Sequence, residues 1–253
     1  MPNVIAARPS SYGKYKENAF AHLREIGIRH VEIDAPPPDQ VEKVRAHLEG
    51  FGLSATSLNG YTSLEEPDAA SAIKPALEAA QAMGVAVVFL SAKAGSAPKH
   101  VAYARLREIG ELAARHGVTV AVETHPDLAE NGTVALQTMQ AVDHPNIRIN
   151  FDPANVHYYN QGVDAVEELR KIAPYVASVH LKDTNGGYHT WHFPALGEGV
   201  VDFPSIFRIL NERGMSGPFT LEIEGIEGED LSEEEMQARV ARSLDYLKRI
   251  GAA

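Results

Sequence analysis

The chain contains no cysteine, which excludes disulfide bonds, thiolate zinc sites and a cysteine nucleophile. Basic residues are also scarce, because 23 Lys and Arg stand against 34 Asp and Glu, a formal net charge of -11. Without a basic surplus, nucleic acid and anionic membranes are poor partners. No run of about 18 apolar residues occurs, and the first residues lack the pattern of a signal peptide. A soluble, cytoplasmic protein is therefore expected.

Short β-branched runs alternate with longer segments of helical spacing from end to end, a pattern typical of βα units and a parallel sheet. Eight strands are predicted, at Val4–Ala7, Val31–Ile33, Ser54–Leu58, Val85–Leu90, Val118–Glu123, Ile147–Phe151, Val176–Leu181 and Phe219–Ile223. Eight such units in 253 residues favour a closed (β/α)8 TIM barrel over an open, doubly wound sheet. We therefore expect an α/β fold with a single domain over residues 1–253.

Two helices and one loop have clear limits in the sequence. The segment Lys99–His116 has an apolar stripe and is followed by Gly117, which suits a left-handed helix stop. The last helix is predicted to begin with a capping box, formed by Ser232 and Glu235. The longest loop, residues 183–202, follows the seventh strand and is interpreted as a candidate lid, because long loops on the active face of a barrel usually serve function.

Four residues with metal-binding side chains stand at the downstream ends of four successive predicted strands: Glu123, Asp152, His180 and Glu222. Parallel strands end at the same edge of a barrel, so these side chains should converge on its active face. Three carboxylates brought together repel one another, and a cation is needed to hold them. A single acid at a strand end is most often a helix cap, but four in register favour a metal site.

The donor set of three carboxylates and one imidazole suits one divalent ion, either Mn²⁺, Mg²⁺ or Co²⁺, with Zn²⁺ as a further candidate. Such an ion could hold two vicinal oxygens of a substrate and stabilise the enediolate formed when the adjacent C–H proton is removed. Glu123 and Glu222 would then flank the substrate carbons and exchange that proton as catalytic acid and base. The expected substrate therefore carries a carbonyl next to a second oxygen-bearing carbon.

Two further side chains are predicted to face the same pocket. His125 lies two residues beyond Glu123, and Lys182 lies two residues beyond His180, so the alternation of a strand points them to the same side as those ligands. His125 could touch a substrate hydroxyl or act as acid or base, and Lys182 could neutralise an oxyanion. The plain alternatives are a loop histidine bonded to backbone and a solvated lysine.

Other polar residues are predicted to lie around the four ligands, His125 and Lys182. Asp183 is predicted to orient His180 or Lys182 from behind, as metal-bound imidazoles usually require, and Glu32 is assigned to the same supporting layer. In the long loop, His192 and Glu198 are candidates for substrate contacts. Ordinary roles as a turn cap or loop residue compete with each of these assignments.

Five segments carry motifs of a known family. They are Val122–Pro126, Asn150–Asn155, Val179–Asp183, Leu196–Phe203 and Gly217–Glu222, and the last two are the most specific. These segments resemble the xylose isomerase-like TIM-barrel superfamily, the sugar phosphate isomerase/epimerase group. The resemblance implies that Glu123, Asp152, His180 and Glu222 bind one divalent metal and that the two glutamates form the acid/base pair. Barrels of this family often assemble as dimers or larger, so a homo-oligomer is one open expectation.

Departures from the family bear on the substrate. In similar ketose epimerases, a His three residues beyond the metal-binding Asp and an Arg six beyond the metal-binding His contact the sugar, whereas this chain has Asn155 and Gly186 there. Asn155 is kept as a candidate substrate contact. The AP endonuclease branch needs additional His ligands for three zinc ions, including one at the place of Asn155, and the charge of -11 also disfavours DNA as a substrate.

Three functions remain in consideration. The leading hypothesis is a metal-dependent isomerase or epimerase of a small sugar or keto-polyol. The second is a lyase that uses the same site for elimination, as the family's inosose dehydratases do, or on a 3-keto sugar. The third is a sugar-binding barrel without catalysis. No glycine loop that could cradle a phosphate is found, which favours an unphosphorylated substrate.

Overall fold

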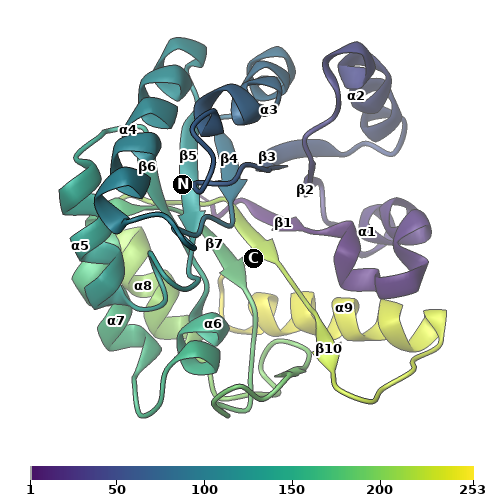
Figure 1. Ribbon diagram of the computed structural model, residues 1–253. Coiled ribbons are helices and arrows are strands. Elements are labelled where there is room, and N and C mark those ends of the chain that lie inside the picture. Colours follow the sequence, from purple (N-terminus) through teal and green to yellow (C-terminus); the bar gives the residue numbers. More distant parts are fainter. Residues whose placement is uncertain (1) are drawn as a thin grey trace.

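The computed structural model describes residues 2–253, in which eight parallel strands close into a barrel (Figure 1). The barrel strands are β1 (Ile5–Ala7), β2 (His30–Asp34), β3 (Ser54–Gly60), β4 (Val87–Leu90), β5 (Thr119–Glu123), β6 (Ile147–Phe151), β7 (Val176–Leu181) and β9 (Phe219–Leu221). They pair in chain order, and β9 pairs with β1 to close the ring. The predicted barrel and its eight strands are confirmed, with strand ends that differ by at most two residues.

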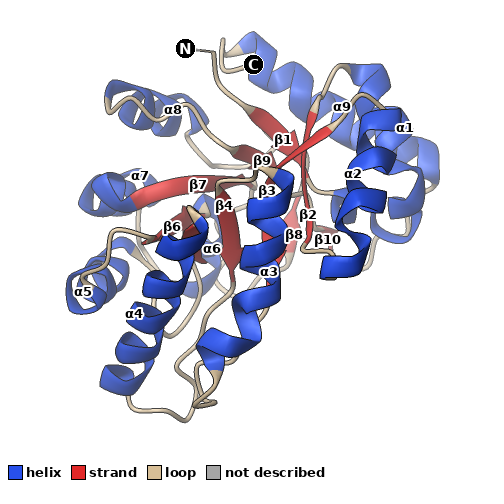
Figure 2. Ribbon diagram, turned by 90° about the horizontal axis from the view of Figure 1, so that it is seen from above, coloured by secondary structure: helices blue, strands red, loops and turns tan. Residues whose placement is uncertain are grey.

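Helices surround the barrel on its outer side, as Figure 2 shows from above. They are α1 (Ala19–Ile26), α2 (Val41–Gly50), α3 (Ala69–Met83), α4 (Lys99–His116), α5 (Gly132–Val142), α6 (Pro153–Tyr159), α7 (Ala165–Ile172), α8 (Phe203–Glu212) and α9 (Glu233–Arg249). Short 3₁₀ segments lie at η1 (Pro9–Asn18), η2 (Pro38–Gln40) and η3 (Ala173–Tyr175). Among residues 2–253, none of these helices has the length and apolar character to cross a membrane.

The two helix limits predicted from sequence are confirmed. Helix α4 ends at His116, and Gly117 takes a left-handed conformation with φ 67°, while its N–H donates to carbonyl groups in the last turn. Glycine adopts this conformation without the steric cost that a Cβ would bring. Helix α9 begins with the capping box of Ser232 and Glu235, in which each side chain accepts a backbone N–H from the other residue.

Alternate residues of each strand serve different layers. In β5, Val120 and Val122 join the hydrophobic core that lies between the strands and the helices. The contact between His180 of β7 and Glu32 of β2 joins two strands that are not neighbours in the ring, which places both side chains inside the barrel. Because successive side chains of a strand point to opposite faces, those that face the helices build the core. Those that face the barrel interior near the strand ends can take part in binding or catalysis.

The predicted lid contains regular structure. It includes β8 (His192–Phe193), which pairs antiparallel with β10 (Gly225–Ile226) after β9. The carboxylate of Asp183 fastens the other part of the loop, because it accepts the N–H groups of Gly197 and Gly199 at 2.8 and 2.9 Å and that of Val201 at 3.1 Å. The loop is therefore anchored at both of its sides, close to the downstream end of β7.

Candidate metal centre and substrate pocket

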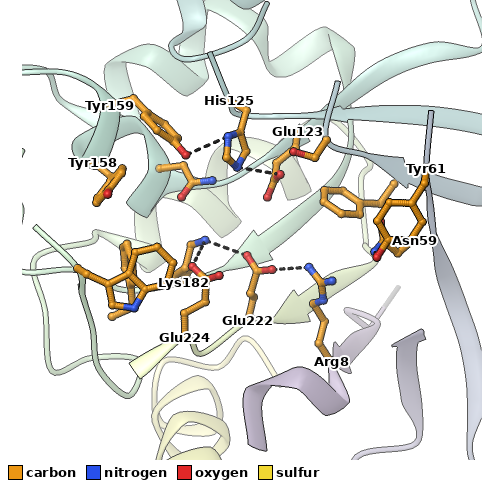
Figure 3. A pocket seen from close by; sticks show the side chains of 15 residues that line it. Arg8, Asn59, Tyr61, Glu123, His125, Tyr158, Tyr159, Lys182, Glu222 and Glu224 are labelled. Atoms are coloured by element: carbon orange, nitrogen blue, oxygen red, sulfur yellow. Dashed lines mark hydrogen bonds and ion pairs between the residues drawn. The ribbon is translucent and has the colours of Figure 1, made fainter. Parts of the chain in front are cut away.

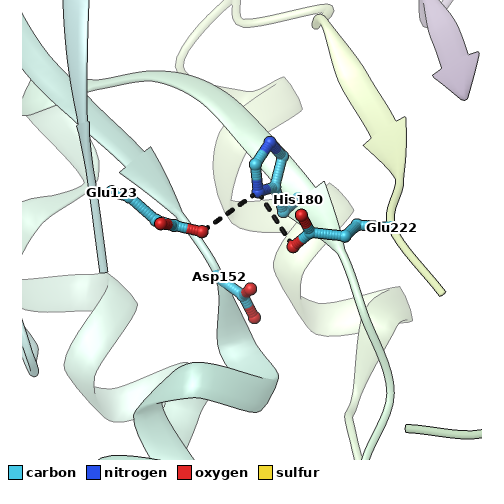
Figure 4. Close-up of side chains that lie close together, drawn as sticks. All are labelled: Glu123, Asp152, His180 and Glu222. Atoms are coloured by element: carbon cyan, nitrogen blue, oxygen red, sulfur yellow. Dashed lines mark ion pairs between the residues drawn. The ribbon is translucent and has the colours of Figure 1, made fainter. Parts of the chain in front are cut away.

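Glu123, Asp152, His180 and Glu222 meet at the carboxyl end of the barrel (Figure 4). One ligand atom of each residue lies within 4.8 Å of those of the other three, and all four side chains are buried. Glu123 is the last residue of β5 and His180 lies in β7, while Asp152 and Glu222 directly follow β6 and β9. The structure thus brings together the four residues that the sequence places in register.

Within residues 2–253, two buried atoms of this group have no hydrogen-bond partner, namely Asp152 Oδ2 and His180 Nδ1. The other oxygen of Asp152, Oδ1, accepts the N–H of Asn155 at 3.0 Å and caps α6. His180 Nδ1 lies 3.1 Å from Glu222 Oε2 and 3.4 Å from Glu123 Oε1. Buried polar atoms without a partner are costly, so this convergence of free donor atoms fits a divalent metal.

Glu32 lies behind His180 at the position that the sequence analysis assigned to a supporting residue. His180 Nε2 is 2.9 Å from Glu32 Oε1, and the other oxygen of Glu32 accepts the hydroxyl of Ser57 at 2.6 Å. Both side chains are buried, at 0 % and 1 % exposure. A carboxylate in this place fixes the ring and leaves Nδ1 to face the other three residues, as is common for metal-bound histidines.

The electrostatic balance of the group is set by burial and by neighbouring charges. Burial by itself would lower the pKa of His180, but Glu222 and Glu32 raise it well above its usual value. Burial would likewise raise the pKa of Glu123, yet hydrogen bonds from His125 and His180 lower it to about 2. The pKa of Glu222 is held well below its usual value by His180 and Lys182, against the effect of burial.

Asp152 differs from the two glutamates, because burial raises its pKa to about 6 although Lys182 is close. Its Oδ2 lies 2.8 Å from Lys182 Nζ without the alignment of a hydrogen bond. Lys182 Nζ also donates to Glu222 Oε2 at 2.9 Å and to Glu224 Oε2 at 3.0 Å. Three carboxylates, in spite of burial, hold the pKa of Lys182 well above its usual value. Lys182 is therefore a buried ammonium group at the edge of the candidate metal group, which consists of Glu123, Asp152, His180 and Glu222.

Arg8 pairs with the second oxygen of Glu222 (Figure 3). Its Nε also lies 3.5 Å from Glu32 Oε1, so the guanidinium spans a residue of the metal group and the residue behind His180. Arg8 was not predicted from the sequence, although it directly follows the first strand. Glu224 was also missed, and its signal is the same alternation that pointed to Lys182, since it lies two residues beyond Glu222.

His125 joins Glu123 to a tyrosine on the far side of the pocket. Its Nε2 lies 3.1 Å from Glu123 Oε2, and its Nδ1 lies 2.9 Å from the hydroxyl of Tyr159 (Figure 3). Burial and the charge of Glu123 raise the pKa of Tyr159 to about 12, which keeps its hydroxyl protonated at neutral pH. These three side chains form a row of groups that can hold or pass a proton.

A cavity of about 250 Å³ opens over this group. Its lining residues are Arg8, Asn59, Tyr61, Phe89, Ser91, Glu123, His125, Asn155, Tyr158, Tyr159, Lys182, Trp191, Phe193, Glu222 and Glu224. Pockets for drug-sized ligands begin at about 300 Å³, so this one suits a molecule of monosaccharide size. Of the predicted substrate contacts, His125, Asn155 and Lys182 line the cavity. Tyr158 and Tyr159 of its aromatic wall were not predicted, because nothing in the periodicity indicated helix α6.

Three predicted residues are placed differently. Glu198 is half exposed and pairs with Arg242 of α9 at 3.0 Å, so it points away from the cavity lining. His192 is also outside that lining, because alternation in β8 turns its neighbours Trp191 and Phe193 to the cavity instead. The hydrogen bonds of Asp183 go to backbone N–H groups of its own loop, not to His180 or Lys182.

The sequence matches a family described as the xylose isomerase-like TIM barrel over residues 20–250. Among curated proteins, 3-dehydroshikimate dehydratase of Bacillus anthracis is 28% identical over 160 residues, which are 56% of this chain and 55% of the relative. L-ribulose-5-phosphate 3-epimerase UlaE of Escherichia coli O157:H7 is 29% identical over 184 residues, which are 70% of this chain and 61% of the relative. The chain thus covers less than two thirds of the length of each. These relatives are enzymes of two different reaction types.

Solved structures agree on the fold. A xylose isomerase domain protein from Planctomyces limnophilus has a TM-score of 0.79 at 23% identity, and the match covers 99% of this chain and 98% of that one. D-psicose 3-epimerase from Clostridium cellulolyticum H10, solved with D-tagatose, has a TM-score of 0.77 at 15% identity, with coverage of 97% and 98%. Likeness at these identities concerns the barrel and not the reaction.

Proposed function

The chain belongs to the xylose isomerase-like TIM-barrel family, and on that basis we propose that it is a divalent-metal-dependent isomerase or epimerase of a small sugar or keto-polyol. One observation carries the proposal. Glu123 and Glu222 stand on the two sides of His180, and both line the same cavity (Figure 4). Two carboxylates that flank a bound substrate can remove a proton from one face of a carbon and return one to the other face.

The proposed ligands are Glu123, Asp152, His180 and Glu222. A divalent ion bound there supplies positive charge that polarises a substrate carbonyl and stabilises the negative oxygen that forms as the neighbouring C–H proton leaves. The oxygen-rich donor set favours manganese, magnesium or cobalt, and zinc remains a candidate. Manganese, a cytoplasmic location and a homo-oligomeric assembly stay predictions from sequence.

The other side chains orient the two glutamates. His125 holds one oxygen of Glu123 and, through its contact with Tyr159, can help to carry the proton that this carboxylate accepts. Arg8 holds one oxygen of Glu222 in place, and Lys182 holds the other before the ion binds. The glutamate that is ionised when the substrate binds accepts the proton from the substrate carbon. The other glutamate has to carry a proton at that point and donates it to the opposite face, so the two have exchanged protonation states when the product leaves.

An unphosphorylated substrate is supported by the charges of the cavity. Arg8 and Lys182 are the cations among its lining residues, and both are already paired with carboxylates. A phosphate would therefore meet Glu123, Glu222 and Glu224 without an unpaired cationic side chain among the lining residues to bind it. Neutral hydroxyl groups can instead contact Asn155, and the aromatic side chains can pack against a sugar ring.

A lyase is the second candidate, and His125 with Tyr159 favours it. Elimination needs a base that takes the proton next to the carbonyl and an acid that protonates the hydroxyl leaving from the following carbon as water. The pair of His125 and Tyr159 adds acid/base groups on the Glu123 side of the cavity. The dehydratase relative supports the same reaction type.

The test is a screen of neutral ketoses, inososes and 3-keto sugars with the Mn²⁺-supplemented protein, followed by NMR in deuterated water. We expect deuterium to enter the carbon next to the carbonyl. A product of unchanged mass, apart from deuterium, indicates an isomerase or epimerase, and loss of water indicates a lyase. Metal analysis of protein purified without chelators is done in parallel. A protein with no stoichiometric divalent metal would instead favour a binding barrel.

A further inference from the structure

Lys182 places an ammonium group among three carboxylates. Its Nζ lies 2.8 Å from Asp152 Oδ2, 2.9 Å from Glu222 Oε2 and 3.0 Å from Glu224 Oε2, and its side chain is only 3 % exposed. Asp152 and Glu222 belong to the proposed metal group, whereas Glu224 does not. A cation of the chain itself therefore uses two of the carboxylates that a divalent ion would use.

The second oxygens of these two carboxylates are engaged elsewhere. Asp152 Oδ1 accepts the N–H of Asn155 as the cap of α6, and Glu222 Oε1 pairs with Arg8. Each carboxylate consequently offers only one oxygen to Lys182 and to the metal. Glu222 Oε2 shows this sharing directly, because it faces both Lys182 Nζ and His180 Nδ1.

We propose that Lys182 is a positioning residue that competes with the divalent ion for Asp152 Oδ2 and Glu222 Oε2, and so sets the metal affinity of the site. Glu224 is the carboxylate that keeps the ammonium when the ion is bound. A lysine suits this role, since its flexible stem carries a compact charge with three donors and can give up two partners while keeping one. The inference rests on the proposed metal site.

The sign of the effect follows from the charges. Without the ammonium, the ligand carboxylates repel one another more strongly when no metal is bound, which raises the free energy of the metal-free protein. Once the metal is bound, the ion is no longer repelled by a positive charge beside its ligands. Both changes favour binding, so removal of the charge of Lys182 should tighten the metal site.

The experiment measures the affinity of chelator-treated, full-length protein for Mn²⁺ alone by calorimetry. We expect one Mn²⁺ per chain in the wild type and at least tenfold tighter binding in Lys182→Met, which keeps the length of the side chain without its charge. Lys182→Arg keeps the charge and should stay closer to the wild type than to Lys182→Met. The control is Lys171→Met, which removes a lysine paired with Glu168 at 2.6 Å outside the site and should leave the affinity unchanged.

A second variant decides the case if Lys182→Met does not fold without metal. Glu224→Gln removes the partner that is not a metal ligand, so Lys182 should hold Asp152 and Glu222 more firmly and Mn²⁺ binding should weaken. Where Lys182→Met does fold, the same change in that background should cost less affinity. Unchanged or tighter Mn²⁺ binding in a folded Glu224→Gln, or equal costs in both backgrounds, would overturn the role of Glu224.

The outcomes separate this inference from the proposed function. A wild type that binds no divalent metal contradicts the metal site itself. A wild type that binds Mn²⁺, together with a folded Lys182→Met that binds it equally or more weakly, overturns the competition and leaves the proposed function standing. Thermal unfolding gives an independent reading, because Mn²⁺ should raise the Tm of Lys182→Met by more than it raises that of the wild type.

Discussion

Glu32 of β2 and His180 of β7 belong to strands that β9 and β1 separate in the ring, yet their side chains meet inside the barrel, with Glu32 Oε1 2.9 Å from His180 Nε2. The carboxylate holds the imidazole with its other nitrogen toward the metal group. Glu32→Gln should therefore weaken Mn²⁺ binding by about 10- to 100-fold, the usual cost of losing such a support. Calorimetry measures it, with Glu42→Gln on the exposed face of α2 as the control. Unchanged affinity would mean that His180 needs no orienting carboxylate.

The two glutamates are expected to be needed for proton exchange. Glu123→Gln and Glu222→Gln keep the shape of each side chain but remove the base, so each should slow solvent-deuterium exchange by about 10²- to 10⁴-fold. NMR in deuterated water measures the exchange, and the metal content of each variant is determined alongside it, because both residues are also proposed ligands. Solvent-deuterium exchange that is retained in both variants would contradict the proposed mechanism.

His125 distinguishes the two candidate reactions. If the protein is a lyase in which His125 acts as acid or base, His125→Gln should lower turnover by about 10²- to 10⁴-fold with little change in Mn²⁺ affinity. If the glutamates alone move the proton, the effect should be much smaller. Tyr159→Phe removes the hydroxyl that lies 2.9 Å from His125 and tests the same row of groups. The products are measured by NMR.

The stability of the loop after β7 should depend on Asp183. Its carboxylate accepts several backbone N–H groups, and Asp183→Ala leaves them without a partner, which should lower the free energy of unfolding by about 3 kcal/mol. Urea unfolding measures the change, and hydrogen exchange should rise in residues 184–201. Glu198→Ala in the same loop breaks only an exposed pair with Arg242 and should cost less than about 1 kcal/mol. Equal losses would contradict this account.

Stability should fall in acid in part because of His22. Burial lowers its pKa, more than the charge of Glu25 raises it, and its Nδ1 lies 2.7 Å from the buried hydroxyl of Tyr12. The unfolded chain, with an ordinary histidine pKa of about 6.5, therefore binds this proton more readily than the folded one. The contribution is complete above about pH 6.5 and is lost as the pH falls below it.

His22→Gln cannot take up that proton, so the difference in unfolding free energy between the wild type and this variant should shrink from pH 7.5 to pH 5. Because all other groups titrate in both proteins, the pH dependence of this free-energy difference reports on His22 alone. Urea unfolding at several pH values measures it. A difference that does not change with pH would show that His22 takes no part.

The barrel could be predicted from the sequence because the alternation of residues along each strand is visible in a short stretch of sequence. In β5, Val120 and Val122 alternate with Ala121 and Glu123, and the same pattern in other strands brings their ends to one edge. The strand ends carried enough information to place Glu123, Asp152, His180 and Glu222 together. They also carried signals for Arg8 and Glu224, which were not used.

Loop residues could not be placed in the same way. Glu198 and His192 lie in a segment whose path depends on the bonds of Asp183 and on the pairing of β8 with β10, and neither leaves a periodic mark in the sequence. Tyr158 and Tyr159 reach the cavity only because α6 begins at Pro153, with Asp152 as its cap. Contacts that depend on tertiary structure were therefore the ones that sequence reasoning missed.

Asp152 shares its two oxygens between a helix and a site. Because Oδ1 caps α6 and Oδ2 faces the metal group, the start of the helix that carries Tyr158 and Tyr159 is tied to the place where the ion would sit. If an ion binds at this place and a sugar packs against the two tyrosines, the two ligands should be coupled, and each should change the protein's affinity for the other by the same factor.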